Sequence, residues 1–78
     1  MWREEDNKLV REFEFNDFKE AFAFMVKVAL LAEKMDHHPD WTNSWNKVHI
    51  SLYTHSEGNI VTEKDRKFAS QIDKLIDK

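Results

Sequence analysis

The stretch "NDFKEAFAFMVKVALLAEKMDHHPD" (residues 16–40) holds the strongest structural signal in the chain. Apolar side chains recur at helical spacing from Phe18 to Met35, and this periodicity is typical of an amphipathic helix. Asp17 and Glu20 stand three residues apart, as the two partners of a capping box do at a helix start. The stretch therefore predicts a long helix that begins at Phe18.

The predicted helix ends shortly before Pro39, the only proline in the chain. A proline pushes the residue before it out of the α-helical region, so we expect the helix to stop near His37 or His38. These two adjacent histidines consequently lie at the C-terminal end of the helix, on the turn that leads out of it.

The segment before the helix, Lys8–Phe15, alternates between apolar and polar residues, which is the pattern of a half-buried strand. Arg11 interrupts the apolar side. The turn-forming residues "EEDN" stand between this strand and Trp2, so Trp2 and its neighbours are predicted to form a short strand of their own. The apolar side carries Leu9, Phe13 and Phe15, and the polar side carries Glu12 and Glu14.

The segment after the helix alternates in the same way over residues 45–55, which predicts a strand that ends at His55. Residues 40–44 are its expected hairpin partner, with the turn around Asn46, and "SEGN" is a loop. Thr62 and Asp65 repeat the capping-box spacing, and an amphipathic pattern after them predicts a closing helix. One face of the longer strand carries Val48, Ile50 and Leu52, and the other carries His49, Ser51, Tyr53 and His55.

The expected order of elements is therefore strand, strand, helix, strand, strand, helix. Such an order favours an α+β fold with two layers, in which an antiparallel four-stranded sheet carries both helices on one face. With 78 residues, the chain is long enough for one domain, so residues 1–78 are assigned to a single unit.

The composition excludes several classes of function. Twelve basic against fifteen acidic residues give a net charge of −3, without the basic cluster that nucleic-acid binding needs. The chain has no cysteine and one glycine, which excludes cysteine-ligated metals and glycine-rich phosphate loops. No apolar run approaches the ~20 residues that cross a bilayer, and the charged N-terminus does not resemble a signal peptide. We expect a soluble, cytoplasmic protein.

Three histidines, His37, His38 and His55, are the candidate chemical groups. Adjacent histidines on a turn converge on one metal less easily than an i, i+4 pair on a helix, and no carboxylate clearly completes a ligand set, so no metal site is expected. The dipole of the preceding helix favours a protonated imidazole at its C-terminal end. A charged and a neutral imidazole together would serve as acid and base near neutral pH. Ordinary polar histidines near a turn remain the alternative.

The stretch "EKMDHHPDWTNSWNKVHISLYTH" (residues 33–55) closely resembles the signature of the pterin-4a-carbinolamine dehydratases, also known as dimerisation cofactors of a hepatocyte nuclear factor. The flanking stretches "FEFNDFKEAFAFMVKVALLAEK" and "TEKDRKFASQID" resemble the same family, so the similarity covers nearly the whole chain. The residues that match the signature are Glu33, Lys34, Asp36, His37, His38, Pro39, Trp41, Val48, Ile50, Leu52, Thr54 and His55.

The resemblance implies a dehydratase that removes water from a 4a-hydroxytetrahydropterin and gives the quinonoid dihydropterin, for recycling of the pterin cofactor. By the family's pattern, His37 and His38 carry the acid role and His55 the base role, and no metal or redox cofactor is implied. The residues implied in binding the pterin are Trp2, Asp36, His37, His38, Pro39, Thr54, His55, Ser56 and Glu57.

Several alternatives stay open at the level of sequence. The family resemblance also implies a non-catalytic dimerisation module that acts as a transcriptional cofactor and would not need the histidines. Asp36 could orient a histidine or be solvated at the helix end, and Asp65 is interpreted as a capping residue more readily than as a site residue. Neither the physiological pterin nor the hydroxylase that would supply it follows from the residues.

The helix from Phe18 to Met35 also predicts a homo-oligomer, either a dimer or a tetramer. Its apolar residues form two stripes, which together cover more than the ~100° of circumference that one sheet needs. We expect the second stripe, with Phe24 and Leu31, to face a partner subunit. The first stripe contains Phe18, Phe22, Met25, Ala29 and Ala32, and the second contains Ala21, Phe24, Val28, Leu31 and Met35.

Overall fold

A computed structural model describes residues 1–76. The predicted order of strands and helices is confirmed, with one short 3-10 helix added after the fourth strand. The elements are β1 (Arg3–Glu5), β2 (Lys8–Glu14), α1 (Phe18–Met35), β3 (Asp40–Ser44), β4 (Lys47–Leu52), the 3-10 helix η1 (His55–Glu57) and α2 (Glu63–Ile76).

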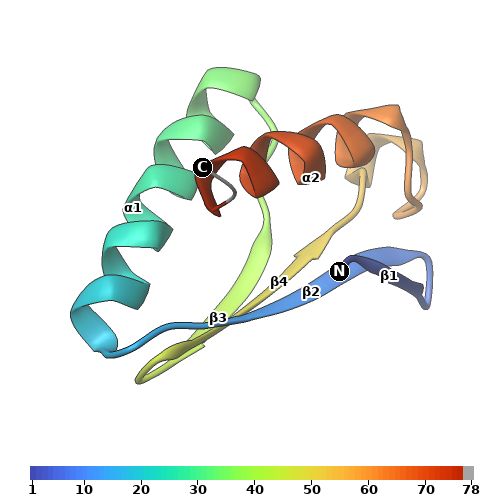
Figure 1. The fold of residues 1–78 in the computed structure, drawn as a ribbon. Coiled ribbons are helices and arrows are strands. Elements are labelled where there is room, and N and C mark those ends of the chain that lie inside the picture. Colours follow the sequence, from blue (N-terminus) through green and yellow to red (C-terminus); the bar gives the residue numbers. More distant parts are fainter. Residues whose placement is uncertain (77–78) are drawn as a thin grey trace.

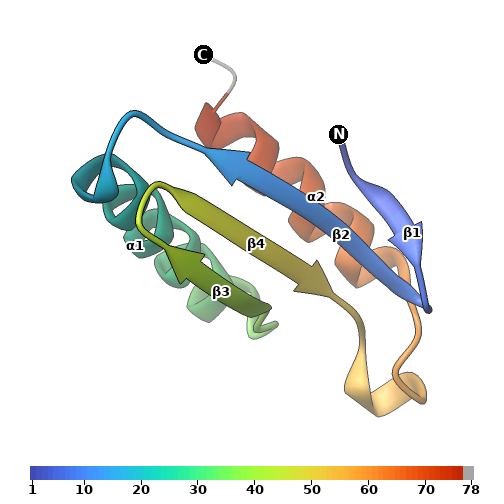
Figure 2. The same cartoon turned by 90° about the horizontal axis from the view of Figure 1, so that it is seen from below.

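The four strands form one antiparallel sheet in the order β1-β2-β4-β3. Both helices lie on the same face of this sheet (Figure 1), and the view from below shows the strands in front of them, with the other face uncovered (Figure 2). The predicted two-layer α+β architecture is therefore confirmed.

Two tight turns set the register of the sheet. Asp6 and Asn7 both have positive φ, of 49° and 63°, between the paired residues Glu5 and Lys8. Positive φ at both central positions defines a type I′ turn, whose twist suits a two-residue hairpin. Between β3 and β4 the positive φ, of 51°, falls on the first central residue, Trp45, and not on Asn46, as in a type II′ turn. The hairpin predicted around Asn46 is thus confirmed.

The start of α1 is capped as the sequence predicts. The Asp17 carboxylate accepts a hydrogen bond from the Glu20 amide at 2.9 Å. The Glu20 carboxylate accepts from the Asn16 amide, also at 2.9 Å, which is one residue further out than in the usual capping box. These two bonds satisfy amides at the start of the helix, and they fix where α1 leaves β2.

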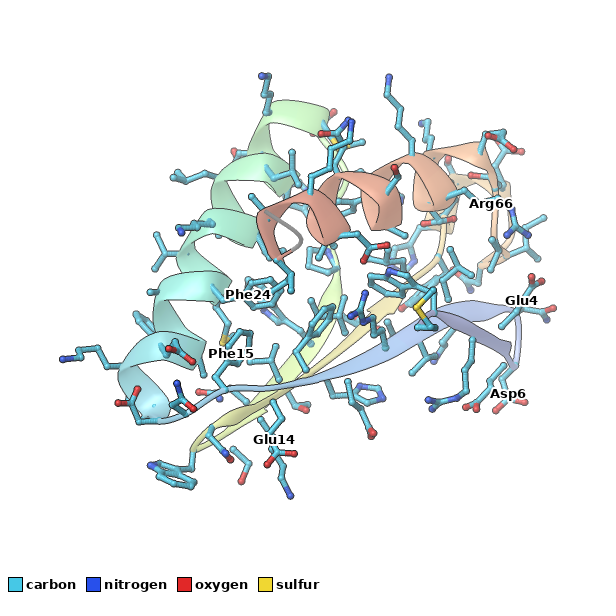
Figure 3. The ribbon with its side chains drawn as sticks, in the orientation of Figure 1. Glu4, Asp6, Glu14, Phe15, Phe24 and Arg66 are labelled. Atoms are coloured by element: carbon cyan, nitrogen blue, oxygen red, sulfur yellow. The ribbon has the colours of Figure 1, made fainter. Side chains whose placement is uncertain are left out.

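The core lies between the sheet and the helices. The side chains of Val48, Ile50 and Leu52 on β4 are fully buried, as are Phe68 and Ile72 on α2. In Figure 3 Glu14 points away from the helices, whereas the aromatic rings of Phe15 and Phe24 lie between α1 and the sheet. The alternation of the strands therefore marks the buried face correctly.

Arg11 interrupts the apolar side of β2 because its guanidinium reaches a carboxylate on α2. Its Nη1 atom lies 2.7 Å from Asp73 Oδ1, and the guanidinium also lies over the Phe13 ring, 4.5 Å from the centroid. The Trp2 indole donates to the same Asp73 oxygen at 2.8 Å. This cluster ties β2, and the residue that precedes β1, to α2.

The expectation about the two stripes of α1 is wrong. The buried residues of α1 are Ala21, Phe24, Val28 and Ala32, so the stripe expected to face a partner is largely the one that packs on the sheet. Phe24 packs against the rings of Phe13 and Phe15, with centroid distances of 4.8 and 5.0 Å. Helical periodicity shows that two stripes exist, but only the position of the sheet selects the inner one.

A different row of α1 is exposed. Its members follow one another at intervals of four residues, so they lie on one side of the helix. The row consists of Phe18, Phe22, Val26 and Leu30, with 46%, 50%, 45% and 68% of their surfaces exposed. Within residues 1–76, no helix has the length and apolar character needed to span a membrane.

Candidate active site

The end of α1 sets the direction of His37. Asp36 adopts the left-handed conformation, with φ of 51°, immediately after the last helical residue. The Asp36 amide donates to Glu33 O at 3.2 Å and the His37 amide to Ala32 O at 3.0 Å. These two bonds are those of a Schellman motif, in which the left-handed residue reverses the chain. The reversal brings the His37 ring close to α2, where only 11% of the side chain stays exposed.

The His37 ring contacts a buried carboxylate. His37 Nε2 lies 2.6 Å from Asp65 Oδ1, and the Asp65 side chain is fully buried. The other oxygen, Oδ2, accepts from Thr54 Oγ1 at 2.8 Å and from the Thr62 amide at 2.9 Å. The contact occupies Nε2 of His37, and Nδ1 is the other ring nitrogen.

Asp65 combines the capping role predicted for it with this contact to His37. It is the third residue of α2, and its bond from the Thr62 amide is the backward arm of a capping box. Thr62 Oγ1 instead forms a hydrogen bond with Thr54 Oγ1, at 2.7 Å. The N-terminal end of a helix also favours a negative charge. The contact with His37 joins residues 28 apart in the chain, and no local pattern could have revealed it.

The second histidine of the pair lies in a different environment. His38 Nε2 lies 2.6 Å from Glu33 Oε2, and the two side chains are 58% and 77% exposed. Asp36 is the residue that the sequence pattern offers for orienting a histidine. In the structure Glu33 and Asp65 form the contacts with the imidazoles, whereas Asp36 forms the turn between them.

The predicted position of His55 at the end of a strand is wrong. Strand β4 ends at Leu52, and Thr54 then pairs with Ile60 in an isolated bridge that closes a loop. His55 is the first residue of η1 inside this loop, and its ring is exposed, with the centroid 4.7 Å from that of Tyr53. The side chain of Thr54 is buried because it bonds to Asp65. The residues from Thr54 onward therefore no longer alternate between the two faces of the sheet as β4 does.

The three histidines line a single open cavity of about 330 Å³. Among the residues predicted to bind a ligand, Asp36, Pro39, Thr54 and Ser56 also line it. Glu57 and Trp2 do not, and the Trp2 indole is bound to Asp73 beside Phe13 instead. A larger hollow, of about 430 Å³, lies against β2, β3 and β4, but none of these three histidines lines it.

Sequence reasoning missed three further residues of the cavity wall: Asp40, Tyr53 and Lys64. The Tyr53 hydroxyl donates to Asp40 Oδ2 at 2.8 Å. This hydrogen bond to the carboxylate is the main cause that raises the pKa of Tyr53 above its ordinary value. Tyr53 could have been predicted because it is next to Thr54 in the sequence. Lys64 could not, because it lies on α2 and comes close to the histidines only when the chain is folded.

The described part of the chain contains no group of three or more histidine, cysteine, aspartate or glutamate residues placed to hold a metal ion. The carboxylates near the histidines each contact a single imidazole: Asp65 contacts His37, and Glu33 contacts His38. The arrangement provides acids and bases around an open cavity, and this is what general acid–base catalysis requires.

Comparison with known proteins places the chain in one family. Residues 1–75 match the model of the family described as pterin 4 alpha carbinolamine dehydratase. A protein of Prochlorococcus marinus (strain NATL2A), named "Putative pterin-4-alpha-carbinolamine dehydratase", is 61% identical over 72 residues, which are 91% of this chain and 75% of that protein. A protein of Rhodospirillum rubrum with the same name is 52% identical over 68 residues, which are 87% of this chain and 70% of that protein.

Two solved structures have the same fold. A transcriptional coactivator/pterin dehydratase from Brucella melitensis superposes with a TM-score of 0.89 at 47% identity, over 95% of this chain and 80% of that one. A pterin dehydratase-like protein, reported as a RuBisCO assembly factor in the alpha-carboxysome, superposes with a TM-score of 0.80 at 30% identity, over 95% and 87%. The chain therefore belongs to the pterin 4 alpha carbinolamine dehydratase family, as the sequence resemblance implied.

Proposed function

We propose that this protein dehydrates a 4a-hydroxytetrahydropterin to the quinonoid dihydropterin, with histidines as general acid and base. The observation that carries the proposal is that His37, His38 and His55 line one open cavity although they come from two separate segments. Histidine is the side chain best able to donate or accept a proton near neutral pH, and the reaction needs both transfers.

The chemistry requires two proton transfers and no electron transfer. The C4a–O bond breaks and the hydroxyl leaves as water, which requires a proton from an acid. The N5–H bond breaks, its proton passes to a base, and its electron pair forms the C4a=N5 bond. In the proposal His37 and His38, whose rings contact carboxylates, carry the acid role. His55, whose exposed ring lies beside Tyr53, carries the base role.

Asp65 is the positioning residue of the proposed site. It holds the His37 ring in one orientation and stabilises the positive charge of a protonated imidazole. Pro39, Thr54 and Ser56 would hold the pterin ring, together with Asp36, because they line the same cavity. Trp2 and Glu57 have no part in the proposal, since neither lines it.

The test is a dehydratase assay on enzymatically generated 4a-hydroxytetrahydropterin. Replacing His55 with alanine should lower turnover by on the order of 10²–10⁴, the usual range for one positioned acid or base. Lys19→Gln, on the exposed start of α1, is the control and should keep the wild-type rate. A wild-type rate no higher than that of buffer would rule the enzyme out.

The exposed apolar row of α1 supports a second proposal, which concerns assembly and is compatible with the enzyme. Phe18, Phe22, Val26 and Leu30 form a run of the kind that marks interaction sites. We propose that this row joins copies of the chain into a homodimer or homotetramer. Glutamate at Phe22 should split the assembly in light scattering while the fold persists. A monomeric wild type at micromolar concentration would contradict this.

A further inference from the structure

A second cavity lies between the two helices, on the far side of His37 from the proposed reaction site. Its volume is about 410 Å³, and Leu31 and Met35 supply much of its apolar wall. Both side chains are partly buried and pack against the core. Three lysines from two helices line the same groove: Lys34 on α1, and Lys64 and Lys67 on α2.

The groove is cationic although the chain as a whole is acidic. The chain has fifteen acidic and twelve basic residues, yet no carboxylate among residues 1–76 lines this cavity. In the part of the chain that the structure describes, none of these three lysines takes part in an ion pair. An apolar surface beside several ammonium groups suits a ligand that has an apolar body and a negative end.

The groove and the histidine cavity share two wall residues. His37 and Lys64 line both of them, whereas Leu31 and Lys67 line the groove alone. Lys34 lies in the same sequence segment as the histidines, yet it lines only the groove. The two cavities are therefore adjacent, with His37 and Lys64 between them.

From these contacts, and resting on the proposed function, we infer that the pterin bound here has an acidic arm at its 6-position. The pterin ring occupies the histidine cavity, an apolar or aromatic part of the arm lies on Leu31 and Met35, and its carboxylate or phosphate end lies among the lysines. A pterin with a short uncharged arm leaves this groove empty. The groove thereby selects a substrate class within the reaction.

The test measures binding of two stable dihydropterins to the intact protein, followed by fluorescence. One probe, 7,8-dihydrofolate, has an aromatic arm that ends in carboxylates, and the other, 7,8-dihydrobiopterin, has a short uncharged arm. The variant is Lys34→Gln combined with Lys67→Gln, since neither residue lines the histidine cavity. The matched control is Lys19→Gln combined with Lys47→Gln, two exposed lysines outside the groove, which changes the net charge equally.

The acidic probe should bind the wild type more tightly than the neutral probe. The groove variant should weaken acidic binding by roughly 3- to 30-fold, as two partly solvated charge pairs do, and should leave the neutral probe unaffected. Added salt should reduce the preference. The control pair should change little.

Three results would overturn the inference, and they separate it from the proposed function. If the protein dehydrates 4a-hydroxytetrahydropterin but binds the two probes with equal affinity, the inference of an acidic arm is wrong and the proposed function stands. An equal loss in the groove variant and in its control rejects the lysines as the cause. Absence of both binding and dehydration rejects the pterin function and the inference together.

Discussion

His37 and His38 are neighbours in the chain, yet the structure gives them opposite surroundings. His37 is 11% exposed and contacts a fully buried carboxylate, whereas His38 is 58% exposed and contacts a carboxylate that is itself 77% exposed. The distance between ring nitrogen and carboxylate oxygen is 2.6 Å in both pairs. Two pairs with the same distance can therefore contribute differently to the stability of the fold, because solvent screens the exposed pair and not the buried one.

The largest effect is expected from removing the buried carboxylate. Asp65→Ala should destabilise the fold by about 3–5 kcal/mol, because it leaves His37 without its partner and removes the acceptor for Thr54 and Thr62. Urea unfolding followed by circular dichroism measures this change. A loss below about 1 kcal/mol would mean that Asp65 is no more important than an exposed residue.

A smaller effect is expected at the turn that separates the two histidines. Asp36 has positive φ, so a β-branched residue is strained there, whereas glycine is not. Asp36→Ile should cost about 1–3 kcal/mol of stability. Asp36→Gly should leave the stability of the fold and the position of His37 unchanged. The nitrogen chemical shifts of the His37 ring, measured by NMR, report that position. Equal stability of the two variants would contradict the role of the left-handed turn.

Removing the exposed carboxylate should have little effect on the fold. Glu33→Ala should change the free energy of unfolding by less than about 1 kcal/mol, because solvent screens the pair and its side chains lose entropy when they associate. The same urea measurement applies, so Asp65→Ala and Glu33→Ala form a matched pair. A cost similar to that of Asp65→Ala would show that the two histidine–carboxylate pairs contribute equally to stability.

The smallest effect concerns Tyr53, which stands beside the third histidine. Its pKa is raised, chiefly because the hydroxyl donates to Asp40. Folding therefore favours the neutral phenol. This contribution to stability is complete below the unfolded pKa, about 10, and is lost as pH rises through the higher folded value.

Because Tyr53 is the only tyrosine, ultraviolet titration follows it directly. Its midpoint should lie above about 10 in the folded protein and fall in Asp40→Ala. A midpoint that Asp40→Ala leaves unchanged would show that the hydrogen bond has no influence on the phenol.

Elements with local signals can be predicted from the sequence. The capping residues before Phe18 fixed the start of α1, because a helix start depends on residues within one turn of it. Alternation fixed the buried face of β4 through Val48 and Ile50, since neighbouring residues of a strand point to opposite faces. The pair of histidines before Pro39 identified the candidate site through its resemblance to a family.

Contacts between distant segments, in contrast, depend on how the elements pack in three dimensions. Asp65 contacts His37, and the Trp2 indole bonds to Asp73 instead of lining the histidine cavity. Phe24, which was expected on the outer side of α1, is buried on the core side. His55 also lies on a 3-10 helix and not on a strand, because Thr54 leaves the sheet to bond with Asp65. Each of these features depends on two elements packing together, and periodicity within one segment has no information about which partner its faces meet.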